Sequence, residues 1–280
     1  MHHFILPTQD SWISSGSLVK DKNFGGDKIL ELKKVFQNSS FEYQTQALVN
    51  FAGTDFTELS QSVSSGDVPS NAEYFLRLFE AEGTSELSEE YMLAAYPLFK
   101  SWVEGNGKSE DNPKTTNGVS WENRNDILNG SQISWSYTDG AKELALAGDL
   151  DRNGITFEEF HVAFGTSTQA FGSVTGSDFL GGNDSDDMGG VWINRAGYIA
   201  SQSFSSEPAD VEMNVTDMVN KWINGQADNY GMILKFSGSQ ETNSTTYGHL
   251  KFFARESQTI FQPKLEVRWD DHLPCTGSNT

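Results

Sequence analysis

Cysteine is nearly absent from this chain of 280 residues, which contains only Cys275. A single cysteine cannot form an internal disulfide, so the fold must be stabilised by side-chain packing. No apolar run is long enough to cross a bilayer, and residues 1–7 lack the basic and apolar segments of an export signal. We therefore expect neither a membrane-inserted helix nor a signal peptide.

Basic residues are also few, since 19 Lys and Arg are set against 39 Asp and Glu and give a formal net charge of −20. Phosphate backbones and anionic lipids repel so acidic a protein, so we expect no nucleic acid among its partners. The five histidines show no metal-ligand spacing, and no nucleophile elbow or phosphate-binding loop occurs. We therefore expect no catalytic residues and no enzyme activity.

Apolar residues, by contrast, are sufficient for a core, at 36% of the chain with 12% aromatic. Short apolar segments separated by turn residues favour an all-β fold, a jelly-roll-like antiparallel β-sandwich. The clearest strand is 264–269, where Leu265, Val267 and Trp269 alternate with charged residues. The other expected strands include residues 12–13, 29–35, 46–51, 74–79, 231–236 and 249–254.

We expect only a few short helices. In residues 215–225, Thr216 is expected to cap the first turn and Gly225 to end the helix. A helical turn is expected at residues 55–59, an irregular or helical link at 87–99, and an extended loop at 101–125. The whole chain, 1–280, is expected to form a single domain with a long acidic loop or helical insert at 136–190 and a C-terminal tail at 271–280.

Short motifs follow one another in a fixed order along most of the chain. They comprise Asp10, Trp12-Ile13, Asn23 and Gly25; Trp102, Glu104, Gly105, Gly118, Ser120 and Trp121; then Val215-Thr216, Trp222, Gly225, Asn229, Gly231, residues 253–257, Pro263, Leu265 and Val267. In this order they resemble the DNRLRE family of surface β-sandwich domains. The resemblance implies a sandwich like those of carbohydrate-binding and surface proteins, without a catalytic centre, and places Trp102, Trp121, Trp222 and Trp269 in the core.

The acidic insert contains one candidate metal site. Residues 149–154 place oxygen ligands at alternate positions before a glycine, as at the start of an EF-hand calcium loop. Phe160 holds the twelfth position, where that loop has its glutamate. The candidate Ca²⁺ ligands are Asp149, Asp151, Asn153 and Glu159, the alternative being a solvated acidic turn. A second cluster of carboxylates comprises Asp184, Asp186 and Asp187.

Three tryptophans outside the core motifs are candidates for binding a sugar. Trp12, Trp135 and Trp192 lie near expected loops. Sugars stack their apolar faces on aromatic rings, while planar polar side chains bind the hydroxyls.

The function expected from these observations is structural. Domains that the chain resembles act outside the cell, and lysis releases a virion protein that lacks an export signal. We therefore expect a non-enzymatic structural or adhesion component of a tailed-phage virion, in the tail, baseplate, neck or capsid surface. It would be assembled in the host cytoplasm and would dock to other virion proteins and copies of itself through sheet edges and loops.

Two other functions remain open. The first is a carbohydrate-binding module or adhesin at the cell surface or outside the cell, recognising a host glycan such as a cell-surface polysaccharide. The second is a polysaccharide-degrading enzyme. Bound sugar that depends on exposed tryptophans would indicate the first, and turnover that depends on a single carboxylate would indicate the second.

Overall fold

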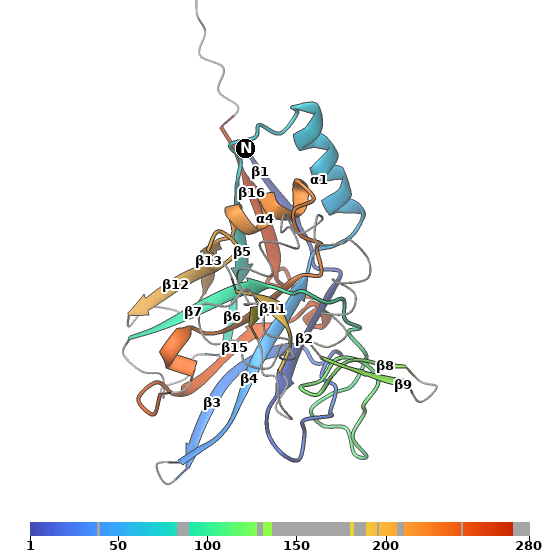
Figure 1. Cartoon of the computed structure of the whole chain (residues 1–280), viewed down its shortest axis with the longest axis vertical. Helices are drawn as coiled ribbons and strands as arrows, with labels where there is room; N and C mark the ends of the chain where they lie inside the picture. The colour runs from blue at the N-terminus through green and yellow to red at the C-terminus, as the bar shows by residue number, and fades with distance from the viewer. Residues whose placement is uncertain are drawn as a thin grey trace, which may run out of the picture.

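The structure is a computed structural model. It describes residues 1–37, 40–82, 90–127, 131–135, 180–181, 189–194, 196–205, 210–241 and 243–270. The expected all-β sandwich is confirmed, because antiparallel sheets dominate and the two α-helices in these ranges are short (Figure 1).

The smaller sheet has four strands in the order β1 (His2–Ile5), β16 (Lys264–Arg268), β5 (Glu73–Leu78) and β13 (Val211–Asn214). All of its pairings are antiparallel. In β16, Glu266 is only 4% exposed, against the expected alternation at residues 264–269, while Leu265 and Val267 are fully buried as expected. Their partners across the sheet, Leu76 and Tyr74, are buried as well. One face of this sheet therefore forms a wall of the core, and the other faces outward.

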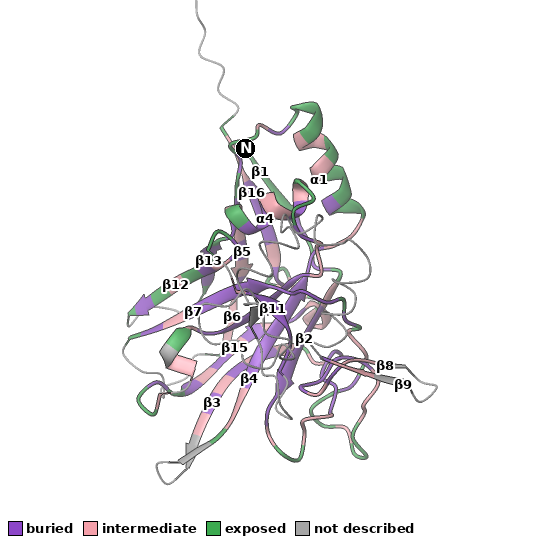
Figure 2. Cartoon of the chain, viewed as in Figure 1, coloured by how far each residue is buried: buried purple, intermediate pink, exposed green. Residues whose placement is uncertain are grey.

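The larger sheet has eight strands and begins in the order β12 (Ala200–Ser205), β7 (Glu90–Pro97), β14 (Met232–Phe236) and β4 (Ser40–Asn50). It continues through β3 (Ile29–Gln37), β15 (Gly248–Phe253) and β6 (Glu80–Glu82), while β2 (Gln9–Ser14) pairs with β4. All five residues of β14 are buried. The centre of this sheet is therefore covered on both faces (Figure 2).

Two short hairpins accompany the sheets, β8 (Asn123–Ile127) with β9 (Ser131–Ser134), and β10 (Leu180–Gly181) with β11 (Trp192–Ile193). The two α-helices, α1 (Thr54–Ser65) and α4 (Thr216–Ile223), lie at the end of the molecule that carries the N-terminus (Figure 1). They meet through Phe56 and Trp222, whose ring centroids lie 6.1 Å apart. Short 3-10 turns occur at η2 (Gly238–Glu241) and η3 (Arg255–Ser257).

Two local predictions were wrong, and a third, a helical turn, was right but too short. The link expected to be irregular or helical at 87–99 contains strand β7, because its place between β12 and β14 outweighs the helix propensity of its Met, Leu and Ala residues. The turn expected at 55–59 belongs to the twelve-residue helix α1. Thr216 does not cap α4; its hydroxyl instead accepts a hydrogen bond of 2.9 Å from the Tyr74 amide and ties the helix to β5.

The loop at residues 101–122 has no regular structure and is held by one buried side chain. Asn23 is completely buried, and its Nδ2 donates hydrogen bonds to the carbonyls of Glu104 (2.6 Å) and Val119 (2.8 Å). Its Oδ1 accepts from the amides of Gly25 (3.2 Å) and Gly107 (2.7 Å). Three of these four bonds thus join the link before β3 to two distant parts of this loop, and the fourth shapes the link itself.

Glycine is needed around Asn23 because the chains approach so closely. A Cβ atom at Gly105, whose φ is +78°, would lie 2.1 Å from the Asn117 carbonyl oxygen and 2.3 Å from Asn23 Oδ1. Such contacts are far inside van der Waals separation. The asparagine and glycine motifs near the start and middle of the sequence therefore form one packed junction.

Replacing Asn23 by alanine is expected to lower the free energy of unfolding by about 3 kcal/mol or more, because four main-chain groups lose their partner inside the protein. Urea unfolding followed by tryptophan fluorescence measures the change. Asn71→Ala is the matched control, since Asn71 is exposed. Equal midpoints for the two variants would contradict the structural role assigned to Asn23.

Candidate functional site

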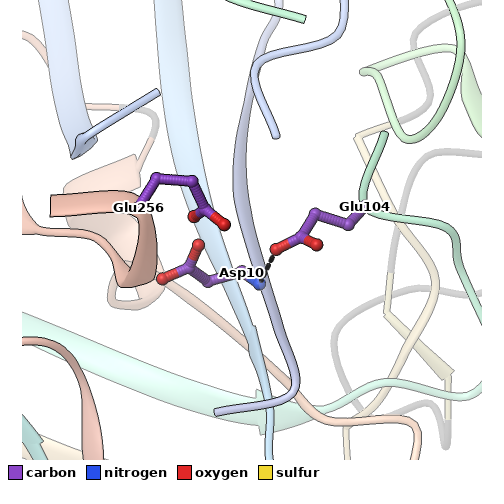
Figure 3. Close-up of side chains that lie close together, drawn as sticks. All are labelled: Asp10, Glu104 and Glu256. Atoms are coloured by element: carbon purple, nitrogen blue, oxygen red, sulfur yellow. Dashed lines mark hydrogen bonds between the residues drawn. The ribbon is translucent and has the colours of Figure 1, made fainter. Parts of the chain in front are cut away.

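Three carboxylates from distant parts of the chain converge beside the Asn23 junction. Asp10 lies on β2, Glu104 in the 101–122 loop, and Glu256 in η3. Each offers an oxygen, and these three oxygens all lie within 4.8 Å of one another (Figure 3). Asp10 is only 1% exposed, whereas Glu104 and Glu256 are partly buried. All three belong to the motifs that carry the family resemblance, but no local pattern in the sequence indicates that they form one group.

Arg255 and main-chain amides bind this carboxylate group. The Asp10 amide donates a hydrogen bond of 2.9 Å to Glu104 Oε1, and the Arg255 amide donates one of 2.7 Å to Asp10 Oδ2. Arg255 Nη2 lies 2.6 Å from Glu104 Oε2 and 2.7 Å from Glu256 Oε1. Glu256 Oε2 is buried without a hydrogen-bond partner.

Burial sets the protonation of Asp10. Removal from water raises the pKa of its carboxyl well above the usual value, and the negative charges of Glu256 and Glu104 raise it further. The hydrogen bond from the Arg255 amide opposes this effect without reversing it. Burial also raises the pKa of Glu104, in spite of its contact with Arg255. The group therefore retains a proton more readily than three isolated carboxylates would.

The donor set fits a polar latch better than a resident calcium ion. Ca²⁺ takes six to eight oxygen ligands. Here the guanidinium of Arg255 already supplies positive charge to Glu104 and Glu256, and a main-chain amide occupies one oxygen of Asp10. We interpret the Asp10–Glu104–Arg255–Glu256 group, hereafter the acidic latch, as a link between β2, the 101–122 loop and η3.

The three tryptophans expected to bind sugar are all buried. Trp12 is 6% exposed and stacks on Phe24 with centroids 3.7 Å apart, and Trp135 is 1% exposed with its indole N–H donated to the Ser120 carbonyl. Trp192 is 8% exposed. The rings are therefore not open to solvent. Trp102, Trp121 and Trp222 are buried, as the resemblance implies.

Trp192 lies beside a charged lysine side chain. Lys235 Nζ is 4.0 Å from the centroid of its ring and 2.5 Å from Glu241 Oε2. The amides of Gln44 and Gln46 also donate to Glu241, and Gln46 Oε1 is buried without a partner. Burial lowers the pKa of Lys235, although Glu241 opposes the shift. This group is enclosed, and sequence reasoning missed it because Lys235 occupies a strand position otherwise expected to be apolar.

The candidate calcium ligands Asp149, Asp151, Asn153 and Glu159 lie outside the described residues. The same holds for the second cluster, Asp184, Asp186 and Asp187. Both remain predictions. Within the ranges that the structure covers, no helix has the length and apolar character to cross a membrane.

A partly exposed aromatic surface runs from the outer side of the four-stranded sheet to β15 of the larger sheet. Phe4, Phe79, Phe253 and Phe261, with Lys264 among them, form what we call the phenylalanine strip. Lys264 Nζ lies 5.4 Å from the Phe4 centroid and 5.3 Å from that of Phe79, and Phe261 lies 5.7 Å from Phe79 and 5.6 Å from Phe253. Phe4 is 49% and Phe261 45% exposed. Sequence reasoning missed this strip because its residues come from four separate segments.

Beside the phenylalanine strip, an ion-pair network covers the same sheet face. Glu266 is contacted by Arg268 (2.7 Å), Arg77 (3.4 Å) and His2 (2.7 Å), and both arginines also contact Glu212. The hydrogen bond from Arg268 is the main cause that lowers the pKa of Glu266 to about 2, with His2 and Arg77 adding to it against the effect of burial. This network fixes the outer face of β5 and β16.

Comparison with protein-family models and with curated proteins finds no match for this chain. Its function therefore has to be inferred from the surfaces and groups that the structure describes.

Asp10→Asn is expected to raise the thermal unfolding midpoint at pH 7, because it removes a buried charge next to two carboxylates while an amide oxygen still accepts the Arg255 bond. A carboxyl whose pKa is raised on folding stabilises the fold as pH falls through its folded-state pKa. The difference in unfolding midpoint between Asp10→Asn and the natural protein should therefore shrink from pH 7 towards pH 4. Differential scanning calorimetry with EDTA and with Ca²⁺ checks this prediction. A lower unfolding midpoint for Asp10→Asn, together with loss of a Ca²⁺-dependent rise of the midpoint seen in the natural protein, would show that the three carboxylates bind a cation.

Glu266→Gln is expected to destabilise the protein by about 1–2 kcal/mol at pH 7, since each pKa unit corresponds to about 1.4 kcal/mol and the arginines stay partly hydrated. A carboxyl with a lowered pKa contributes stability above its unfolded value, and this contribution is lost as pH falls to about 2. Urea unfolding of both proteins between pH 7 and pH 2 should show the two curves converging. A difference independent of pH would mean that packing alone is affected.

Proposed function

We propose that this protein is a non-catalytic docking module, a structural or adhesion β-sandwich that acts by binding other proteins. The phenylalanine strip is the observation that carries this proposal. Aromatic rings that contact one another and are at least partly exposed are typical of interaction sites, and aromatic residues and arginine dominate the energetic centres of protein interfaces.

The surroundings of the strip favour a protein partner over a sugar. Beside Phe261, the aliphatic side chain of Ile260 is 75% exposed, and Leu6, which follows β1, is 43% exposed. Sugar sites place planar polar groups around an aromatic ring to bind hydroxyls. Here aliphatic side chains and a lysine surround the rings, as at the centre of a protein interface.

The assembly that we propose for this module is a tailed-phage virion. Two observations support the assignment: the strongly acidic composition, with a net charge of −20, and the resemblance of the motifs to surface β-sandwich domains. A virion subunit of this kind would contact neighbouring virion proteins and act at the tail, baseplate, neck or capsid surface. Quantitative mass spectrometry of gradient-purified particles tests the assignment through a fixed copy number per particle.

The alternative, carbohydrate binding, is favoured by the group around Trp192. Tyr96 and Trp192 lie 5.8 Å apart beside Lys235, Gln46 and Glu241, and this combination of rings, amides and charges is found in sugar sites. The group is enclosed, so a sugar would have to displace Trp192. Glycan-array binding that is lost on Trp192→Ala would favour this alternative over docking.

The double variant Phe4→Ser, Phe261→Ser is expected to fold normally and to lose at least about 90% of its incorporation into particles, because removing two interface anchors costs about 1.4 kcal/mol or more. Circular dichroism checks the fold, and immunoblotting of gradient-purified particles measures incorporation. Leu18→Ser is the control, since Leu18 is 85% exposed and does not belong to the strip. Full incorporation of the double variant would refute docking through this surface.

A further inference from the structure

Exposed main-chain edges of β-sheets can pair with strands of other proteins, and this chain covers several of its edges. Between β12 and β13, the side chain of Gln202 accepts a bond of 2.8 Å from the Glu212 amide and donates one of 3.4 Å to the Asp210 carbonyl. At β6, Asp210 Oδ1 accepts the Glu80 amide at 2.7 Å. β6 is also only three residues long and carries two glutamates.

β1 differs from these edges. It pairs with β16 on one side and, among the residues that the structure describes, with no strand on the other. Its first three residues are exposed, as its colour in Figure 2 shows. The apolar side chains along it, Met1, Phe4 and the following Leu6, are 62%, 49% and 43% exposed. An apolar, unpaired edge strand is the feature that strand addition requires.

Charge distinguishes this edge from the rest of the acidic surface. On the outer face of the sheet, Arg77 and Arg268 are matched by Glu212 and Glu266. Lys264 lies directly opposite Arg77 in the strand pairing and has no carboxylate partner among the described residues. Its ammonium lies 5.4 Å from the Phe4 centroid and so reaches over β1. The strip thus carries one unmatched positive charge beside an open strand.

We propose that β1 accepts an extended segment of a partner protein as an added strand, with a carboxylate of that segment placed against Lys264 and apolar side chains on Phe4 and Leu6. This inference rests on the proposed docking function and names the chemistry of the partner. Main-chain hydrogen bonds along β1 supply affinity, while the rings and Lys264 select the side chains. The net charge of −20 does not prevent this pairing, because physiological salt screens charges beyond roughly 8 Å.

The probe is the capped peptide Thr-Val-Glu-Val-Thr-Val-Thr, used with the full-length protein. Two companion peptides replace its glutamate by lysine or carry N-methyl groups on every amide. Fluorescence anisotropy measures binding, and hydrogen exchange measures protection of the amides of residues 2–6. The glutamate peptide is expected to bind and to slow exchange in β1. The N-methylated peptide, which cannot complete a hydrogen-bond ladder, is expected to do neither.

Charge reversal tests the role of Lys264. Lys264→Glu should weaken binding of the glutamate peptide about fivefold and strengthen binding of the lysine peptide, because the side chain that reaches over β1 would then repel the glutamate and attract the lysine. The affinities of Lys264→Gln for both peptides should lie between those of the natural protein and those of Lys264→Glu. Lys108→Glu makes the same change of net charge at an exposed position in the 101–122 loop and should leave both affinities unchanged.

Each of the following results would overturn the proposal as stated. Binding that is unaffected by Lys264→Glu would exclude the charge contact. Binding of polygalacturonate through Phe4 and Lys264, without binding of any peptide, would make the partner an acidic polysaccharide. Concentration-dependent self-association in analytical ultracentrifugation that Phe4→Ser abolishes would make it a second copy of this chain. If no peptide binds but the Phe4→Ser, Phe261→Ser variant still loses incorporation into particles, docking through this surface is supported and strand addition at β1 is excluded.

Discussion

The completely buried carboxamide of Asn23 is the interaction on which the rest of this end of the sandwich depends. It uses both of its polar atoms to bind four main-chain groups from the 23–25 turn and from two parts of the 101–122 loop. No sheet ladder satisfies those groups, and unpaired polar groups in a dry interior are costly. A long loop without regular structure can therefore pack as part of the core and carry Trp102 and Trp121 into it.

The acidic latch depends on that junction. Asn23 binds the carbonyl of Glu104, and the side chain of the same residue reaches the Asp10 amide and Arg255. Buried charges are tolerated when they are paired and hydrogen-bonded, and Arg255 meets that condition for two of the three carboxylates. The arrangement accounts for the Asp, Glu and Arg-Glu motifs as members of one structural link.

The two sheets have different roles. The large sheet is covered on both faces at β14, so it forms the rigid centre of the molecule. The four-stranded sheet is covered on one face and presents ion pairs, the phenylalanine strip and the open edge of β1 on the other. A rigid centre with an apolar, partly cationic outer surface suits a protein that works by contact with a partner, and it explains why aromatic side chains remain exposed on so acidic a chain.

The sequence by itself determined the fold class and several strands, because alternation and turn residues are local signals that burial reinforces, while the family resemblance indicated the buried Trp102, Trp121 and Trp222. The alternation of residues 264–269 predicts that Leu265 and Val267 lie on the inner face of a strand, and they do so in β16. The tertiary structure alone decided that residues 90–97 form a strand, since that depends on their neighbours β12 and β14, and that Trp12, Trp135 and Trp192 are closed off. It also brought together the strip from four segments and the latch from three. Such groups depend on contacts between residues far apart in the chain, and no local pattern encodes that proximity.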